Sequence, residues 1–169
     1  MPELKVILSA SKIKTAQSCS FKYYGSYVLH LPDKQNSGSA KGGVVHIILE
    51  CLANPKRRHL VSKILDQKDP FHGKDCQGIK KLVYKHAHKL NISDDESVEM
   101  MKGFIVNGLS HDFYGEDRGM PIGVYTEKDF LIEAEKYKIR GFIDRLFIYE
   151  DGHALIRDYK SSKQQYQGH

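Results

Sequence analysis

The chain has 169 residues, of which 40% are hydrophobic and 28% are charged. This length and this composition are typical of one domain with a buried core and exclude a disordered chain. The 26 Lys and Arg residues outnumber the 21 Asp and Glu residues and give a net charge of +5 at pH 7, which permits a polyanionic partner such as nucleic acid without establishing one.

Cysteine usage and hydropathy restrict the compartment. The chain has 3 cysteines and no CxxC pair, which argues against a disulfide framework and indicates a reducing environment. Its apolar runs are too short for a membrane span or a secretory signal. We therefore expect no membrane association and a cytoplasmic location, in the host cytoplasm if the protein is viral.

The first two thirds of the chain carry helical patterns. Ser9 or Ser11 can cap a first helix, a Gly- and Ser-rich stretch at 31–43 predicts a loop, and Ser93 with Glu96 has the spacing of a capping box. The periodicity of apolar residues then predicts helices over residues 12–28, 44–52, 76–90 and 93–109.

From Val124 onward the apolar period changes to two. This alternation predicts strands over residues 124–133, 137–150 and 153–160. The last two strands flank Glu150, Asp151 and Gly152, where a left-handed glycine can close a three-residue hairpin loop.

The register of this hairpin determines which side chains meet. With a loop of three residues, Tyr149 lies opposite His153, and Asp144 then lies opposite Asp158. Alternation places Lys160 on the same face. A loop of two residues would instead send the two aspartates to opposite faces of the sheet.

Two opposed carboxylates repel each other and need a positive charge between them. Lys160 alone could supply it in a structural ion-pair cluster, whereas a divalent cation is a better match for two carboxylates. Phe142, Leu146 and Ile148 share the face of Asp144, so we expect that face to be largely buried. This expectation favours the metal site over the ion pair.

These motifs resemble a known family. The stretch "GFIDRLFIYEDGHALIRDYKSS" contains a Gly-x-x-Asp strand followed by an Asp-x-Lys strand, and "AKGGVVHIILECL" contains a Gly-x-x-His helix. Together they resemble the PD-(D/E)XK nuclease superfamily, in its RecB-like branch and with the character of a phage or viral exonuclease. "LSASKIKTAQSCSFKYYGSYVLHLP" is similar to the opening helix of that branch.

The resemblance implies an α/β fold in which amino-terminal helices pack on a small mixed β-sheet, the restriction-endonuclease-like core. We expect a single domain over 1–169, with a helical part at about 9–115 and a sheet part at about 122–160. The branch usually continues after Asp-x-Lys into a further helix with Gln and Tyr, whereas this sequence ends 9 residues beyond Lys160. Two explanations stay open: the core is truncated at its carboxyl end, or this version of the fold has lost that helix.

The resemblance also implies a role for each motif residue. Mg²⁺ or Mn²⁺ would be bound by Asp144, Asp158, His46 and the backbone carbonyl of Tyr159. Glu127 matches the acidic position on the preceding strand and would hold a metal-bound water or a second ion. Lys160 would orient the attacking water, so that Lys160, Asp158, Asp144 and Glu127 form the catalytic set.

The function implied is metal-dependent hydrolysis of DNA phosphodiesters, as an exonuclease in recombination, repair or phage DNA processing. DNA with a single-stranded or duplex end would be the substrate, contacted by Lys12, Lys14, Lys22, Lys163 and Gln164. A helicase, another recombination protein or a second copy of the chain are the expected partners. The alternatives are a nucleic-acid-binding module with an incomplete or inactive site, a structural protein with an internal ion pair, and a nuclease acting on RNA.

Overall fold

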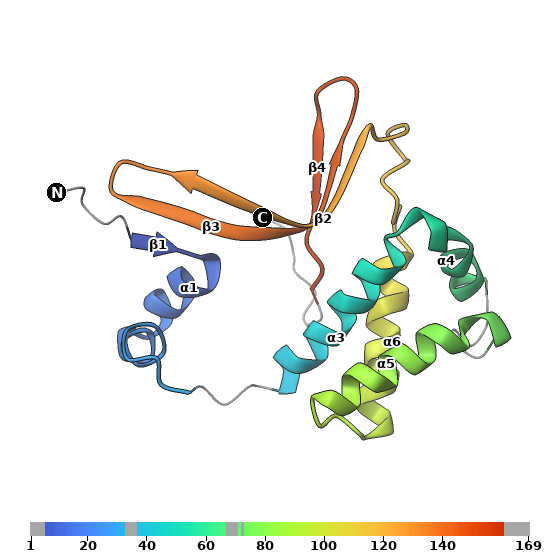
Figure 1. Ribbon diagram of the computed structural model, residues 1–169, viewed down its shortest axis with the longest axis horizontal. Helices are drawn as coiled ribbons and strands as arrows, with labels where there is room; N and C mark the ends of the chain where they lie inside the picture. Colours follow the sequence, from blue (N-terminus) through green and yellow to red (C-terminus); the bar gives the residue numbers. More distant parts are fainter. Residues whose placement is uncertain (1–5, 33–36, 67–70, 72, 161–169) are drawn as a thin grey trace. The chain divides into compact units, whose positions relative to one another are not determined.

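The computed structural model describes residues 6–32, 37–66, 71 and 73–160 (Figure 1). The chain divides into two compact units. One unit contains residues 1–35 and 127–143, and the other contains residues 36–126 and 144–169. Two strands of the sheet pass from one unit into the other, and each unit is described separately below.

The first unit begins with a short strand that the sequence patterns did not predict. Its elements before the sheet are β1 (Val6–Leu8), α1 (Ala10–Ser18), α2 (Ser20–Tyr23) and the π-helical turn η1 (Tyr24–Val28). Ser9 caps α1 as expected, since its hydroxyl accepts a hydrogen bond from the N–H of Lys12 at 3.3 Å. The predicted helix over 12–28 is interrupted at Cys19, whose backbone is extended.

The second unit contains the helical core. Its helices are α3 (Ser37–Leu52), η2 (Pro55–Arg57), α4 (Arg58–Leu65), η3 (Lys74–Cys76), α5 (Gln77–Lys89) and α6 (Asp95–Leu109). Helix α3 packs against both α5 and α6 (Figure 1). The fully buried side chains of Val44, Ile48 and Leu52 lie at helical spacing on α3 and anchor this core.

Three details of these helices differ from the sequence prediction. Helix α3 begins at Ser37, so part of the predicted loop at 31–43 is helical. Helix α4 lies in a basic stretch in which no helix was predicted, and it buries only Val61 and Ile64. The cap of α6 is Asp94 rather than Ser93, because the Asp94 carboxylate accepts a hydrogen bond from the N–H of Ser97 at 2.7 Å.

The sheet has four strands and is mixed, which confirms the predicted α/β class. Besides β1, its strands are β2 (Gly123–Glu133), β3 (Tyr137–Ile148) and β4 (Ala154–Arg157). Strand β3 pairs with β1 in parallel through Tyr137–Ile139 and with β4 antiparallel through its carboxyl-terminal half. Strand β2 is the other neighbour of β3.

The register of the β3–β4 hairpin is the one predicted from the loop length. Ile148 pairs with Ala154, and the ladder continues in step to the pair Arg145–Arg157. At the loop, the N–H of Tyr149 donates to the carbonyl of His153 at 3.0 Å. Gly152 has φ of 81°, the left-handed conformation expected of the residue that closes the loop.

The burial of β3 contradicts the sequence prediction. Phe142 is 61% exposed, and Leu146 and Ile148 are only half-buried, so the face of Asp144 is not the buried one. The opposite face carries Arg145 and Phe147, which are 1% and 0% exposed. Apolar residues occupy both faces of this strand. Because the buried face also carries a charged residue, Arg145, the sequence pattern assigned that face to solvent and the face of Asp144 to the core.

Among the described residues, no helix combines the length and the apolar character that crossing a membrane would require.

Candidate metal centre and catalytic motif

His46 lies on α3 next to the buried Val45, and its imidazole is half-buried. Its Nε2 lies 3.0 Å from the carbonyl oxygen of Tyr159, a residue 113 positions later in the chain. A carbonyl oxygen can only accept a hydrogen bond, so Nε2 must carry the hydrogen in this contact. The structure therefore brings together two of the ligands that the sequence predicted, His46 and the Tyr159 carbonyl.

Asp144 occupies the position on β3 directly after the last residue of the other unit. Its side chain is 13% exposed, and its Oδ1 lies 3.6 Å from Nδ1 of His46. Its Oδ2 accepts a hydrogen bond from the backbone N–H of Tyr159 at 2.7 Å. Asp144 thus contacts two of the three other predicted ligand residues, His46 through Oδ1 and the backbone N–H of Tyr159 through Oδ2.

The contact between His46 and Asp144 has the electrostatics of a cation site. With the hydrogen on Nε2, a neutral imidazole presents the lone pair of Nδ1 toward a carboxylate oxygen 3.6 Å away. A metal ion bound by both atoms would turn that contact from repulsive to attractive. Nitrogen from His, oxygen from Asp and a backbone carbonyl oxygen are also donors that divalent metals accept. The residues present therefore fit a divalent ion.

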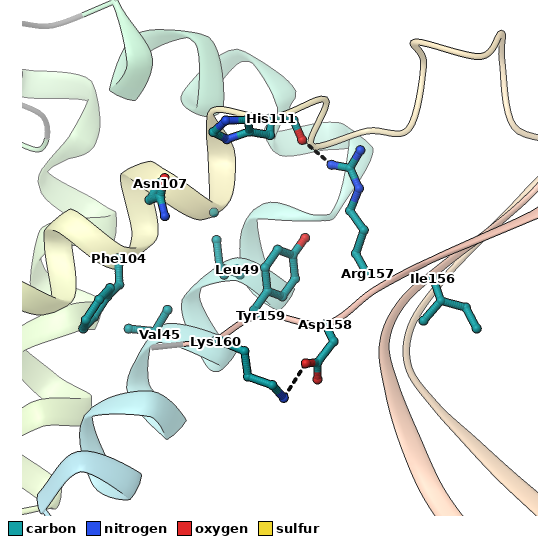
Figure 2. Close-up of a pocket in the computed structure, with 11 residues that line it drawn as sticks. Val45, Leu49, Phe104, Asn107, His111, Ile156, Arg157, Asp158, Tyr159 and Lys160 are labelled. Atoms are coloured by element: carbon teal, nitrogen blue, oxygen red, sulfur yellow. Dashed lines mark hydrogen bonds and ion pairs between the residues drawn. The ribbon is translucent and has the colours of Figure 1, made fainter. Parts of the chain in front are cut away.

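Asp158 and Lys160 lie at the end of β4, where the ladder stops. The last ladder pair is Arg145–Arg157, and the predicted Asp144–Asp158 pair is the next position beyond it. In the structure Asp158 forms an ion pair with Lys160, and the two side chains are 55% and 58% exposed. Figure 2 shows the ring of Tyr159 pointing away from this pair. Asp158 is not a member of the potential metal-binding group that contains His46 and Asp144 among the described residues.

Glu127 lies within β2, directly after Thr126. Its φ is +47°, in the left-handed region that non-glycine residues avoid. Holding a glutamate there costs on the order of 1–3 kcal/mol, and such residues are concentrated at functional sites. The acidic residue that the sequence singled out on this strand is therefore also the one whose backbone is strained.

The guanidinium of Arg145 and the hydroxyl of Tyr159 are buried polar groups that sequence reasoning missed. None of the three side-chain nitrogens of Arg145, nor the hydroxyl of Tyr159, makes a hydrogen bond within the described residues. The guanidinium instead lies over the rings of Phe113 and Phe147, at 4.5 Å and 5.0 Å from their centroids. Burial lowers the pKa of the Arg145 guanidinium and raises the pKa of the Tyr159 hydroxyl.

Arg157 fastens the end of β4 to the helical core. Its guanidinium donates to the carbonyl of His111, to the carbonyl of Asp112 at 2.6 Å and to the Asp112 carboxylate at 3.0 Å. These acceptors follow the carboxyl end of α6, where backbone carbonyls lack helical partners and a cation is favourable. The motif residues that follow Arg157 are thus held close to α6.

Three of the predicted nucleic-acid contacts belong to the first unit, and two lie outside the described residues. Lys12 donates to the carbonyl of Ile7 at 3.0 Å, and Lys14 and Lys22 are exposed on α1 and α2. Lys163 and Gln164 lie outside the described residues. Their role in binding DNA stays a prediction.

The chain is similar to a known protein family. The family model of the PD-(D/E)XK nuclease superfamily matches residues 7–169. No curated protein and no solved structure matches the chain.

Proposed function

Since the chain belongs to the PD-(D/E)XK nuclease superfamily, whose members hydrolyse phosphodiester bonds with the help of divalent metals, we propose that it is a metal-dependent deoxyribonuclease. We further propose that it is an exonuclease of the RecB-like branch, active in recombination, repair or phage DNA processing. The observation that carries this proposal is the meeting of His46, Asp144 and the Tyr159 carbonyl, three residues predicted as ligands of one ion.

The proposed metal is Mg²⁺ or Mn²⁺, bound by Asp144, His46, the Tyr159 carbonyl and Asp158. Glu127, at the acidic position that the resemblance assigns to β2, is the proposed further carboxylate, as a direct ligand or through a water. A metal held by these residues would lower the pKa of a bound water and neutralise charge on the phosphate. The strained backbone of Glu127 supports this role, because it aims a carboxylate at the cost of local stability.

Lys160 is the proposed catalytic cation. In the structure its ammonium group forms an ion pair with Asp158, two residues away, and its side chain is exposed, so that a substrate phosphate can reach the ammonium group. Lys160 would orient the attacking water and stabilise the negative charge that develops on the phosphate oxygens. In the hydrolysis, the water oxygen bonds to phosphorus, the bond from phosphorus to the leaving sugar oxygen breaks, and that oxygen takes up a proton.

The test measures cleavage of end-labelled DNA with Mn²⁺ and with Mg²⁺. The variants are Asp158→Asn and Lys160→Met, with Lys138→Met as a matched control, because Lys138 also pairs with a carboxylate at the surface but lies outside the motif. We expect the motif variants to lose at least about 100-fold in rate, the low end of the effect of removing one electrostatic catalytic group. The control should keep its activity.

Two further substrates separate the alternatives. A circular single strand offers no end, so an exonuclease leaves it intact while it degrades the linear form. Labelled RNA competes with DNA only if both are substrates. If the wild type binds DNA without cutting it under any metal, the chain is a nucleic-acid-binding module with an inactive site and the proposed activity is wrong.

A further inference from the structure

A cavity of about 410 Å³ adjoins the Asp158–Lys160 pair in the second unit (Figure 2). Its walls include apolar and aromatic side chains from α3 and α6 and polar groups from α6 and from the end of β4. The residues that the argument uses are Leu49, Phe104, Asn107, His111, Asp158 and Lys160. A cavity of this size, mostly apolar with a few polar groups, is of the kind that takes a small planar ligand.

The side of α6 that lines the cavity carries an aromatic ring and a side-chain amide that such a ligand can contact. Phe104 and Asn107 are three residues apart and His111 follows four residues later, so the three side chains lie along one side of the helix and its extension. Phe104 packs on the core with one side and remains half-buried. Within the described residues, the exposed amide of Asn107 makes no hydrogen bond, so both its donor and its acceptor are available.

The other polar groups of the cavity are already engaged. Arg157 is bound to the carboxyl end of α6 through Asp112, and the His111 ring contacts the Ser110 hydroxyl at 2.9 Å. The groups left for a ligand are the aromatic face of Phe104 and the side-chain amide of Asn107, with the Asp158–Lys160 ion pair at one side of the cavity. An aromatic face stacks on a nucleobase, and an amide forms paired hydrogen bonds with a base edge.

We propose that this cavity binds the unpaired nucleobase next to the scissile phosphate, with Phe104 as the stacking surface and Asn107 as the group that contacts the base edge. The inference rests on the proposed function, which places Asp158 and Lys160 at that phosphate. A base inside a duplex cannot enter such a cavity without leaving its stack. The substrate is therefore a single strand, or a duplex end that frays before it is cut.

The test is an abasic scan. Single-stranded DNA oligonucleotides carry one tetrahydrofuran abasic residue at successive positions, and cleavage with Mn²⁺ and binding with Ca²⁺ by fluorescence anisotropy are both measured. In the wild type we expect one position, adjacent to the cut, at which loss of the base weakens binding by about tenfold, within the range that stacking of one base on an aromatic residue gives. All other positions should have smaller effects.

Phe104→Leu keeps an apolar side chain of similar size but removes the aromatic face, and Asn107→Ala changes an exposed residue, so both variants should fold. Each should weaken binding of the intact strand by several-fold, and with Phe104→Leu the abasic position should no longer matter. Gln77→Ala is the matched control, since it removes an exposed amide from the start of α5 in the same unit. It should behave as the wild type.

The outcomes distinguish this inference from the proposed function. If the wild type cleaves DNA but the abasic scan is flat, or if both cavity variants match Gln77→Ala, the nuclease assignment stands and the base site is wrong. If the wild type does not cleave, the proposed activity fails, and the binding scan alone decides the base site. Equal cleavage of blunt, non-fraying duplex ends and single strands would also overturn the inference.

Discussion

Asp144 has two separable roles, and two substitutions distinguish them. Its Oδ2 accepts the N–H of Tyr159 at 2.7 Å and so holds the segment beyond β4, while its Oδ1 faces Nδ1 of His46. Asp144→Asn retains an oxygen that can accept the Tyr159 hydrogen bond but removes the negative charge. Asp144→Ala removes both the charge and the hydrogen bond.

The expected magnitudes follow from these contacts. Without metal, Asp144→Ala should lose about 1.5–3 kcal/mol, the contribution of a hydrogen bond to a charged group, whereas Asp144→Asn should lose much less. For a chain of this size each kcal/mol shifts the melting temperature by about 2–4 °C, so Asp144→Ala should melt about 3–12 °C below the wild type. A metal at 100 times its Kd stabilises the wild type by about 2.7 kcal/mol, or about 5–11 °C, and should stabilise neither variant comparably.

The assay is differential scanning calorimetry with Mn²⁺ titrated from zero, with Asp129→Asn as the control. Asp129 is an exposed carboxylate paired with Arg140 in the other unit, and its loss should leave the metal response unchanged. A wild-type shift with Mn²⁺ that persists in Asp144→Ala would refute the metal site. Equal melting of the Asn and Ala variants without metal would refute the structural role of the hydrogen bond to Tyr159.

The remaining predictions concern stability and are measured by urea denaturation. Gly115→Ala should lower the free energy of unfolding by more than about 3 kcal/mol, because φ is 72° and the new Cβ would lie 2.5 Å from the buried ring of Phe147. Gly152→Ala has φ of 81° but open space around the new Cβ, so it should lower the free energy of unfolding by only about 1–2 kcal/mol. Equal losses in the two variants would contradict this reasoning. Arg145→Met removes a buried charge without a hydrogen-bond partner within the described residues, so it should change stability by less than about 1 kcal/mol or increase it, and a loss of several kcal/mol would contradict that account. Hydrogen bonds from Ser97 hold the pKa of the Asp94 carboxyl below its ordinary value of 3.8. Asp94→Ala should therefore be less stable than the wild type above that pH. The free energies of unfolding of the two proteins should converge as the pH falls through the lowered pKa. A difference that persists unchanged into acid would refute the capping role.

The hairpin was predictable because its register depends on few residues. Loop length and the left-handed Gly152 fix which residues pair, and these are local properties of the sequence. From the pairing, the closeness of Asp144 to the segment after Arg157 follows. His46 was added by resemblance alone, since its contact with Tyr159 joins residues 113 positions apart and no local pattern encodes it.

The burial of β3 was not predictable for a physical reason. Both faces of the strand carry large apolar residues, and the deciding residue on the inner face is Arg145, which any hydropathy pattern assigns to solvent. Its charge is accommodated by the rings of Phe113 and Phe147, which come from different parts of the chain. Helix α4 was missed for another reason: it has only 8 residues, so the helical spacing of its apolar residues is too short a repeat to stand out from the basic stretch around it.

The middle residue of the Asp-x-Lys motif explains how its two charged neighbours are placed. Tyr159 is tied through its N–H to Asp144, through its carbonyl to His46, and through its ring to the helical core. Asp158 and Lys160, on either side of this residue in the segment beyond β4, have side chains that are more than half exposed. The two-residue spacing of aspartate and lysine thus places them on either side of a residue that is anchored to Asp144, to His46 and to the helical core, and this anchor positions their exposed ion pair.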